Sequence, residues 1–175
     1  MSGTSFKLGK REVCEWVRSH FTPDDEILDV GAGCGTWRDL LHEYRNMDAV
    51  EIFPNTAVEI RHKYRKVFCA DVVNHRFTWY DLIIFGDVLE HMTVEDAQAV
   101  LAYTKGRCRD VLIAVPFLYP QGECYGNPWE RHIQDDLTPE LFNERYPGFE
   151  AVFLATNYGY FHRRRESGEQ RDQSV

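Results

Sequence analysis

A glycine-rich turn follows the first strongly apolar run of the chain. The stretch ILDVGAGCG contains Asp29 and three alternating glycines, Gly31, Gly33 and Gly35. A strand, a glycine turn and a helix in succession bring backbone N–H groups close to a ligand. A dinucleotide site would need a glycine in place of Thr36, and the Lys-Ser/Thr pair of a phosphate loop is absent. Because Asp29 would repel a pyrophosphate, the turn favours a cationic ligand.

Carboxyl and imidazole groups follow the fourth expected strand. Glu90 and His91 come after the apolar run at 82–85. A neutral imidazole near physiological pH is a suitable base for an oxygen acceptor. We therefore predict that His91 is catalytic, together with His132 from a later loop. The alternative is that His91 only packs or forms a hydrogen bond at the start of the next helix.

The long segment 116–137 supplies a second set of candidate residues. It contains three prolines and two glycines, and loops of this size in compact domains are usually functional or disordered. The aromatic residues that could wall an acceptor pocket are Tyr119, Tyr125 and Trp129. The polar residues that could orient the acceptor are Glu130, Arg131 and His132. The alternative is a structural loop with Trp129 in the core and Arg131 in a salt bridge.

Strands and helices alternate through most of the chain and must position these groups. Nearly continuous apolar runs predict strands at 27–30, 49–52, 67–70, 82–85 and 111–115. Helical spacing predicts helices at 8–21, around 40–44, at 57–64, after Thr93 and after Thr138. Runs at 151–154 and 158–161 predict a closing hairpin. We therefore predict an α/β fold: a doubly wound, mostly parallel seven-stranded sheet with a C-terminal antiparallel hairpin and helices on both faces.

Composition limits the classes of protein. The chain has 175 residues, 43% of them hydrophobic, and we expect a single domain over residues 1–165 with a polar tail over 166–175. The formal net charge of −8 makes nucleic acid an unlikely partner. The arginine run at 163–165 is expected to be a solvated strand edge. Its longest apolar runs are far shorter than the ~20 residues that cross a bilayer, so we expect no membrane insertion.

The cysteines suggest the compartment. Five cysteines are scattered along the chain without a CxxC pair. An odd number without close spacing favours neither a disulfide framework nor a zinc site. We expect reduced, mostly buried thiols in a cytoplasmic protein. Whether a homodimer or a partner subunit contributes to acceptor recognition is left open.

Four segments in order resemble the motifs of class I S-adenosylmethionine-dependent methyltransferases. ILDVGAGCGTW resembles motif I, and DLIIFGDVLEHM resembles motif IV. The other two segments lie between them and contain Glu51 with Ile52 and Asp71 with Val72. The resemblance implies S-adenosylmethionine as the cofactor. It places Glu51 on the ribose hydroxyls and Ile52 on the adenine face. It also places Asp71 and Val72 at the adenine edge and Asp87 near the methionine end. The cofactor-binding residues so implied are Asp29, Gly31, Gly33, Gly35, Glu51, Ile52, Asp71, Val72 and Asp87.

We expect the methyl acceptor to be a small molecule. The signatures of cytosine methylases and of amino-group nucleic-acid methylases are absent, so we expect methyl transfer to an oxygen of a sugar, lipid or other metabolite by in-line displacement. A second hypothesis is a metal-assisted RNA ribose 2′-O-methyltransferase, because Asp87-x-x-Glu90-His91 with His132 resembles the metal ligands of small-RNA methyltransferases. We assign no metal ligand and leave that point open. A third hypothesis is a catalytically silent cofactor-binding scaffold.

Overall fold

The computed structural model describes residues 8–124 and 126–165. Its elements are α1 (Lys10–His20), β1 (Ile27–Val30), α2 (Thr36–Leu40), β2 (Met47–Glu51), α3 (Pro54–Glu59), β3 (Lys66–Cys69), β4 (Tyr80–Gly86), η1 (Leu89–His91), α4 (Val94–Tyr103), β5 (Cys108–Pro116), η2 (Pro128–Glu130), α5 (Pro139–Arg145), β6 (Glu150–Ala155) and β7 (Tyr158–Arg164). None of the helices in these ranges is long and apolar enough to cross a membrane. The predicted tail at 166–175 lies outside the described residues.

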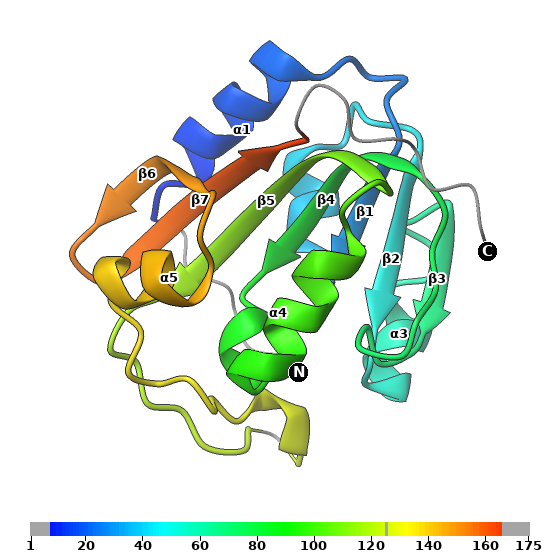
Figure 1. The fold of residues 1–175 in the computed structure, drawn as a ribbon. Helices are drawn as coiled ribbons and strands as arrows, with labels where there is room; N and C mark the ends of the chain where they lie inside the picture. Colours follow the sequence, from blue (N-terminus) through cyan, green and yellow to red (C-terminus); the bar gives the residue numbers. More distant parts are fainter. Residues whose placement is uncertain (1–7, 125, 166–175) are drawn as a thin grey trace.

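Seven strands form one sheet in the order β3-β2-β1-β4-β5-β7-β6 (Figure 1). The first five are parallel, and β7 runs antiparallel to both β5 and β6. In the centre, Ile27 of β1 pairs with Met47 of β2 and with Leu82 of β4. The predicted fold class is confirmed. Because the strand order reverses between β1 and β4, a ligand crevice is expected at their carboxyl ends.

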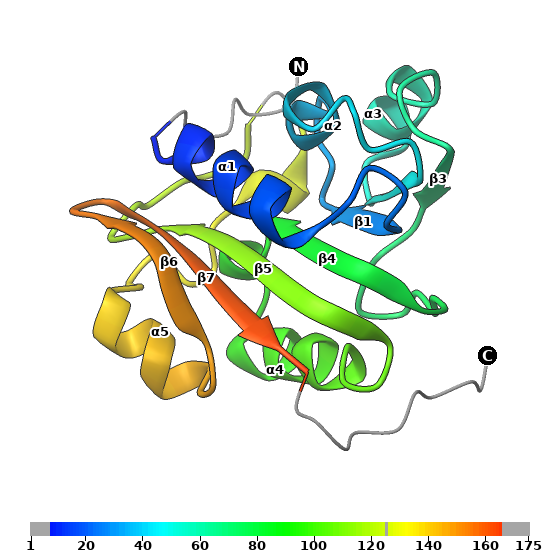
Figure 2. The same ribbon diagram turned by 90° about the horizontal axis from the view of Figure 1, so that it is seen from above.

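Helices cover both faces of this sheet (Figure 2). On one face Val13 and Val17 of α1 and Trp37 of α2 belong to one buried apolar cluster. On the other face Val100 of α4 and Phe142 of α5 belong to a second cluster. Strands β1 and β2 are buried along their whole length. Burial on both faces explains why these strands have continuous apolar runs rather than alternating ones.

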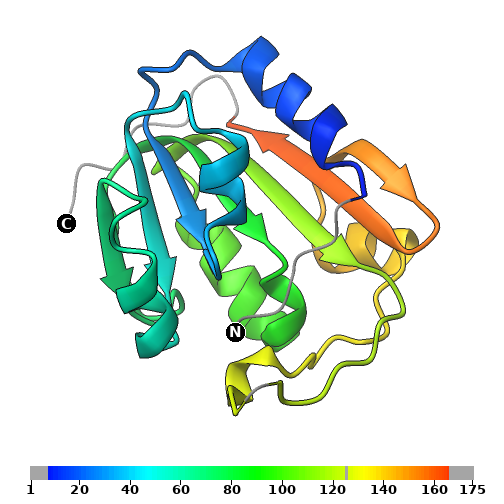
Figure 3. The same cartoon turned by 180° about the vertical axis from the view of Figure 1, so that it is seen from behind.

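The N-terminal helix lies against the C-terminal hairpin (Figure 3). The Tyr160 hydroxyl of β7 donates to the Leu8 carbonyl oxygen at 3.0 Å. The Trp16 ring of α1 lies 4.6 Å from the His162 ring of β7, centroid to centroid. The two ends of the described chain therefore stabilise each other.

Two helices differ from their predicted bounds. Helix α3 begins at Pro54 and ends at Glu59, rather than covering 57–64, because proline favours the first turn of a helix. Helix α2 ends at Leu40, and Leu41 and Tyr44 lie beyond it in turns although both are buried. Their apolar spacing reflects burial rather than helical structure.

The cysteines also differ from their predicted burial. All five are free thiols, but only Cys14 and Cys108 are buried. Cys34 and Cys69 are exposed. Cys34 lies in the glycine turn, and Cys69 ends β3, one of the two edge strands of the sheet. The prediction of mostly buried thiols is therefore wrong, because turns and sheet edges remain open to solvent.

The segment between β5 and α5 crosses beneath the carboxyl ends of the parallel strands (Figure 1). Its two ends meet where the Leu118 N–H donates to the Leu137 carbonyl oxygen at 2.9 Å. Its middle is attached to η1, because the N–H groups of Ile133 and Gln134 donate to the Glu90 carbonyl oxygen at 2.7 and 3.0 Å. This loop therefore has a defined position at the carboxyl ends of the parallel strands.

Candidate functional site

A cavity of about 310 Å³ lies at the carboxyl ends of β1, β2 and β4, beside this loop. We call it the acidic cavity. Nine of the predicted site residues line it: Gly31, Gly33, Glu51, Ile52, Asp71, Val72, Asp87, His91 and His132. The two others, Asp29 and Gly35, do not line it. Side chains and turns distant in sequence therefore meet around one space at the expected edge of the sheet.

Gly31 forms the tight turn directly after the carboxyl end of β1. Its φ is +68°, and a Cβ built on it would lie 2.3 Å from Cγ2 of Val88. Its N–H donates to the Val50 carbonyl oxygen of β2 at 2.9 Å. Both the left-handed conformation and the close approach require glycine. The turn therefore exposes bare backbone to the cavity.

Glu51 ends β2 beside the turn and is buried. Its Oε2 accepts from the Gly33 N–H at 2.8 Å, and its Oε1 accepts from the Phe53 N–H at 2.9 Å. Burial raises the pKa of this carboxyl, and the two backbone donors partly offset that effect. Each carboxylate oxygen retains lone-pair capacity for a further donor. Glu51 is thus held in position to accept hydrogen bonds from hydroxyl groups of a ligand.

Ile52, Asp71 and Val72 form the neighbouring wall. Ile52 and Val72 supply apolar surface. Asp71 follows β3, and its Oδ1 accepts from the Val73 N–H at 2.9 Å, which fixes the turn. An aromatic ring of a ligand could pack against the apolar surface of Ile52 and Val72, with the polar group of Asp71 beside it.

Asp29 lies beneath the turn instead of facing the cavity. It is fully buried, and its Oδ2 accepts from the Tyr64 hydroxyl at 2.6 Å. Burial raises the pKa of Asp29 to about 7. Gly35 is the N-cap residue of α2, and a Cβ there would meet Cδ of Lys63 at 2.9 Å. In this structure both residues shape the turn from behind rather than line the space for a ligand.

Asp87 follows β4 in an unusual conformation. Its φ is +59°, which is rare for a residue with a side chain, though Asp tolerates it better than most. Its Oδ1 accepts a hydrogen bond from the Tyr158 hydroxyl of β7. Strained backbone often marks functional positions. The antiparallel hairpin thus contributes directly to the position of Asp87.

Glu90 is a buried carboxyl without a protein partner. It is 1% exposed, and neither carboxyl oxygen has a hydrogen-bond partner. Burial, followed by the charge of Asp87, raises its pKa well above the usual value. Buried polar groups are normally paired. Since Glu90 lines the cavity, a ligand is the natural partner for it.

His91 and His132 present the same ring nitrogen. Nδ1 of His91 lies 3.1 Å from the Arg131 carbonyl oxygen, and Nδ1 of His132 lies 2.7 Å from the Tyr119 carbonyl oxygen. A carbonyl oxygen only accepts, so in each neutral ring Nδ1 carries the proton and Nε2 has the lone pair. Burial lowers the pKa of both imidazoles. Both are therefore suited to accept a proton or a metal ion.

Glu90, His91 and His132 converge. One possible ligand atom from each lies within 4.8 Å of the others. Asp87, which the sequence grouped with them, is not part of this set and accepts from Tyr158 instead. Hydrogen bonds from Nδ1 to backbone carbonyls are typical of histidines that bind metals through Nε2. Three of the four residues therefore lie close enough together that they could hold a metal ion.

Two aromatic side chains of the loop form walls of the cavity and are not part of the core. Tyr119 and Trp129 line the cavity but remain 42% and 45% exposed. The alternative that placed Trp129 in the core is therefore wrong, because η2 lies on the surface. Glu130 lines the cavity as expected, whereas Arg131 does not and contributes only its carbonyl oxygen to His91. Tyr125 lies outside the described residues.

Acidic side chains predominate among the residues that line the cavity. Its carboxyl groups come from Glu51, Asp71, Asp87, Glu90, Asp96 and Glu130. Among the described residues no lysine or arginine lines it. Such a lining attracts a cation and repels a phosphate. The expectation of a cationic ligand at the glycine turn agrees with this arrangement.

Two residues near the site were not identified from the sequence. Nζ of Lys10 is buried without a hydrogen-bond partner and lies 4.3 Å from the centre of the Trp37 ring. Burial lowers its pKa, and the charges of Asp87 and Asp29 oppose that effect. Tyr158 was expected only as a hairpin residue. No local pattern marks either role, because both depend on contacts between distant segments.

Comparison with known proteins identifies the fold. No family model and no curated sequence matches the chain. A methyltransferase from Clostridium acetobutylicum described as S-adenosylmethionine-dependent is similar over 94% of this chain and 93% of its own, with a TM-score of 0.70 and 13% identity.

Two further solved structures support the same fold. The methyltransferase domain of a bacterial Hen1 protein matches over 90% of this chain and 98% of its own, with a TM-score of 0.64 and 19% identity. Magnesium protoporphyrin IX methyltransferase from Synechocystis, solved with bound S-adenosylmethionine, matches over 94% and 86%, with a TM-score of 0.60 and 14% identity. The seven-stranded sheet of this chain therefore has the fold of the class I S-adenosylmethionine-dependent methyltransferases.

Proposed function

We propose that this protein transfers a methyl group from S-adenosylmethionine to a hydroxyl oxygen of a small, uncharged acceptor. The observation that carries the proposal is the acidic cavity, in which a bare glycine turn and six carboxyl groups face one space. Within the described part of the chain, no lysine or arginine lines this cavity. A sulfonium carries a positive charge that this lining stabilises, whereas a pyrophosphate would be repelled.

The residues fit the parts of this cofactor in order. In this proposal Glu51 accepts hydrogen bonds from the ribose hydroxyls, and Ile52 and Val72 contact the adenine. Gly31 and Asp87 then flank the methionine end. When bound, the cofactor supplies an activated methyl group for in-line displacement. The chain itself needs mainly to align the acceptor and exclude water.

The acceptor would lie next to Glu90, His91 and His132. The Nε2 lone pair of either neutral histidine can take the proton of a hydroxyl as its oxygen attacks. Glu90 can hydrogen-bond a second polar group of the acceptor, because both of its oxygens lack a protein partner. The loop with Tyr119 and Trp129 limits access of water. An anionic acceptor is disfavoured by the carboxyl groups around it.

Calorimetry with S-adenosylhomocysteine tests the cofactor assignment. We expect Glu51→Gln to weaken binding by about 10- to 100-fold, since hydrogen bonds to charged groups contribute ~1.5–3 kcal/mol. Glu150→Gln is the matched control, because Glu150 is exposed on β6. Absence of binding by the wild-type protein would refute the proposal.

Mass spectrometry of metabolite extracts incubated with labelled cofactor tests the transfer. We expect label in an uncharged hydroxylated compound. His91→Asn and His132→Asn should each lower the turnover number by about 10²- to 10⁴-fold if that residue is the base, with the affinity for S-adenosylhomocysteine unchanged. Binding of the cofactor without transfer to any compound would instead support a silent scaffold.

A second candidate is metal-assisted methylation of an RNA ribose hydroxyl. The convergence of Glu90, His91 and His132 within 4.8 Å favours it. Carboxylate and imidazole ligands suit Mn²⁺ or a related divalent ion, which would hold and polarise the acceptor oxygen. The absence of described lysine or arginine around the cavity counts against a phosphate-rich acceptor.

Titration of the full chain with Mn²⁺ separates the two candidates. The metal hypothesis predicts measurable binding that Glu90→Gln and His132→Ala abolish, with Glu150→Gln unaffected. It also predicts transfer to an RNA oligonucleotide that chelation of the metal stops. The first proposal predicts activity on a small molecule that persists after chelation.

A further inference from the structure

A second hollow lies at the opposite end of the sheet, where β5 begins and β7 ends. It has a volume of about 180 Å³ and is bordered by the end of α4, the loop before β6 and the end of β7. Five of the residues that line it are cationic: Lys105, Arg109, Arg163, Arg164 and Arg165. No acidic and no aromatic residue of the described chain lines it. We call it the basic hollow.

The arginine run does not form the solvated edge expected from the sequence. Arg164 is exposed, but Arg163 and Arg165 are half-buried. Nη2 of Arg163 donates to the Leu101 carbonyl oxygen and to Oγ1 of Thr104, both at 3.0 Å. Alternation along β7 sends neighbouring side chains to opposite faces. The run therefore divides between solvent and a packed position against α4.

Aromatic rings fix two of the guanidinium groups. Arg163 lies 4.6 Å from the centre of the Phe149 ring, and Arg165 lies 4.8 Å from the centre of the Trp79 ring. A guanidinium stacked on a ring loses less conformational entropy when it binds an anion. These groups are thus ordered before any ligand arrives.

One side-chain nitrogen of Arg165 lacks a hydrogen-bond acceptor. Its Nη1 is buried and has no hydrogen-bond partner, while its backbone N–H donates to the Arg109 carbonyl oxygen at 2.8 Å. A buried donor left unpaired costs free energy. An oxygen of a bound anion would supply the missing acceptor.

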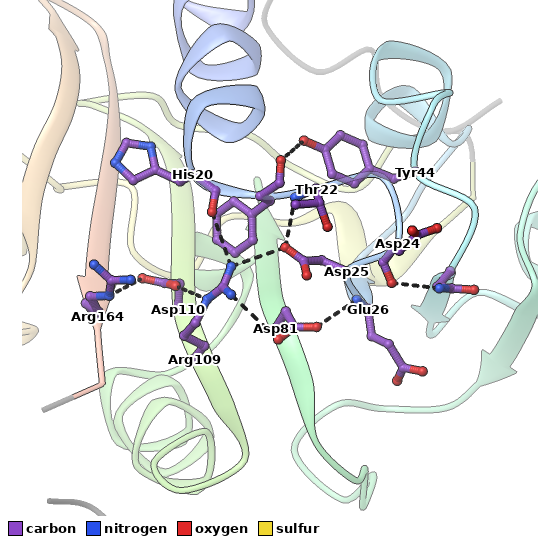
Figure 4. A network of polar contacts seen from close by, with 12 residues as sticks. His20, Thr22, Asp24, Asp25, Glu26, Tyr44, Asp81, Arg109, Asp110 and Arg164 are labelled. Carbon is purple, nitrogen blue, oxygen red and sulfur yellow. Dashed lines mark hydrogen bonds and ion pairs between the residues drawn. The ribbon is translucent and has the colours of Figure 1, made fainter. Parts of the chain in front are cut away.

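Carboxylates behind the hollow hold Arg109 without filling the hollow. Arg109 lies 3.3 Å from Asp25 and 3.0 Å from Asp110, nitrogen to oxygen (Figure 4). Arg164 is also 3.9 Å from Asp110. These acids neutralise part of the charge, but Lys105 and Arg165 also line the hollow and add to it. The balance at the hollow remains positive.

The size and lining restrict the ligand. Pockets for whole drug-sized ligands usually measure ~300–1,000 Å³, so this hollow suits a smaller group. It has no described aromatic wall on which a nucleobase could stack. Arginine forks match the geometry of phosphate oxygens. We propose that the basic hollow binds a compact phosphate group, at a site separate from the acidic cavity.

Titration of the full chain with inorganic phosphate and diphosphate at constant ionic strength tests the proposal. We expect saturable binding, tighter for diphosphate, and a higher melting temperature with either ion. The double variant Lys105→Gln/Arg165→Gln should lose affinity by about tenfold or more. The double variant Arg61→Gln/Lys66→Gln is the control, since it removes the same charge from exposed positions.

The outcomes decide the proposal. Equal phosphate affinity in the two double variants, or no saturable binding by the wild-type protein, would overturn it. If circular dichroism shows that the first variant does not fold, Lys105→Gln alone takes its place, because Lys105 is exposed.

Competition with a nucleoside monophosphate distinguishes the source of the phosphate. If it competes with inorganic phosphate, the ligand is the phosphate end of a larger molecule; if it does not compete, the ligand is a free ion. S-adenosylhomocysteine binding should be unchanged throughout, so a failure here would not affect the proposed function.

Discussion

The two ends of the sheet carry opposite charges. At the carboxyl ends of the parallel strands, six carboxyl groups and no described lysine or arginine line the acidic cavity. At the other end, five cations and no described carboxyl line the basic hollow. The formal net charge of −8 therefore hides a separation of charge along the strands. A single overall charge is a poor guide to the ligands of such a chain.

The pairing of the acids differs as well. Asp25 and Asp110, at the end of the basic hollow, form ion pairs with Arg109. At the other end, Glu90 has no protein partner, and Asp29 has only a neutral hydroxyl. Paired acids stabilise a fold, whereas a buried acid left unpaired costs stability and is retained where a ligand uses it. The unpaired end is thus the one to which we assign chemistry.

The largest expected effect is on the pH dependence of stability. Burial raises the pKa of Asp29 from its usual value to about 7. The folded state then holds the proton more tightly, so this contribution is fully present near pH 4 and is lost as the pH rises through 7. Relative to Asp29→Asn, the wild type should lose up to about 4 kcal/mol of unfolding free energy between pH 4 and 8. Urea denaturation across this range measures it, and parallel curves would mean that Asp29 is ionised when folded.

A change at the glycine turn should weaken cofactor binding while leaving the basic hollow intact. Gly31→Ala introduces a Cβ 2.3 Å from Cγ2 of Val88 at a φ of +68°. Strain and overpacking together cost ~2–5 kcal/mol, so we expect affinity for S-adenosylhomocysteine to fall by about 100-fold. Gly122→Ala is the control, because a Cβ there meets nothing within 4 Å. Equal calorimetric affinities in the two variants would contradict this role for the turn.

A smaller effect is expected from breaking the ion pairs at the other end. Burial alone would raise the pKa of Asp110, but hydrogen bonds from His162 and Arg109 outweigh it and lower the pKa. The stabilisation is therefore present at neutral pH and is lost as the pH falls through the lowered pKa. Asp110→Asn should cost about 2 kcal/mol at pH 7, and less in acid. Urea denaturation at both pH values measures this, and an equal cost at the two would exclude the ionic contribution.

Much of the fold could be predicted from local pattern. The apolar runs that predicted β1, β4 and β5 lie within observed strands, because burial on both faces leaves a continuous apolar signature. The helix predicted after Thr93 is confirmed as α4, and Thr93 caps it, because the Asp96 N–H donates to Oγ1 of Thr93 at 3.1 Å. The helical spacing around Tyr44 was misleading, since a buried turn can show the same spacing.

The sequence by itself determined the order of strands and helices along the chain, the glycine turn and the acids at the carboxyl ends of β2, β3 and β4, because these depend on spacing within short segments. Only the tertiary structure decided that Asp29 lies behind the turn, that Tyr158 holds Asp87, and that Arg163 packs against α4. Each of those facts depends on which distant strands are neighbours and on which face a side chain occupies. Local spacing does not encode such neighbours, because they are fixed only when the whole sheet assembles around its two cores.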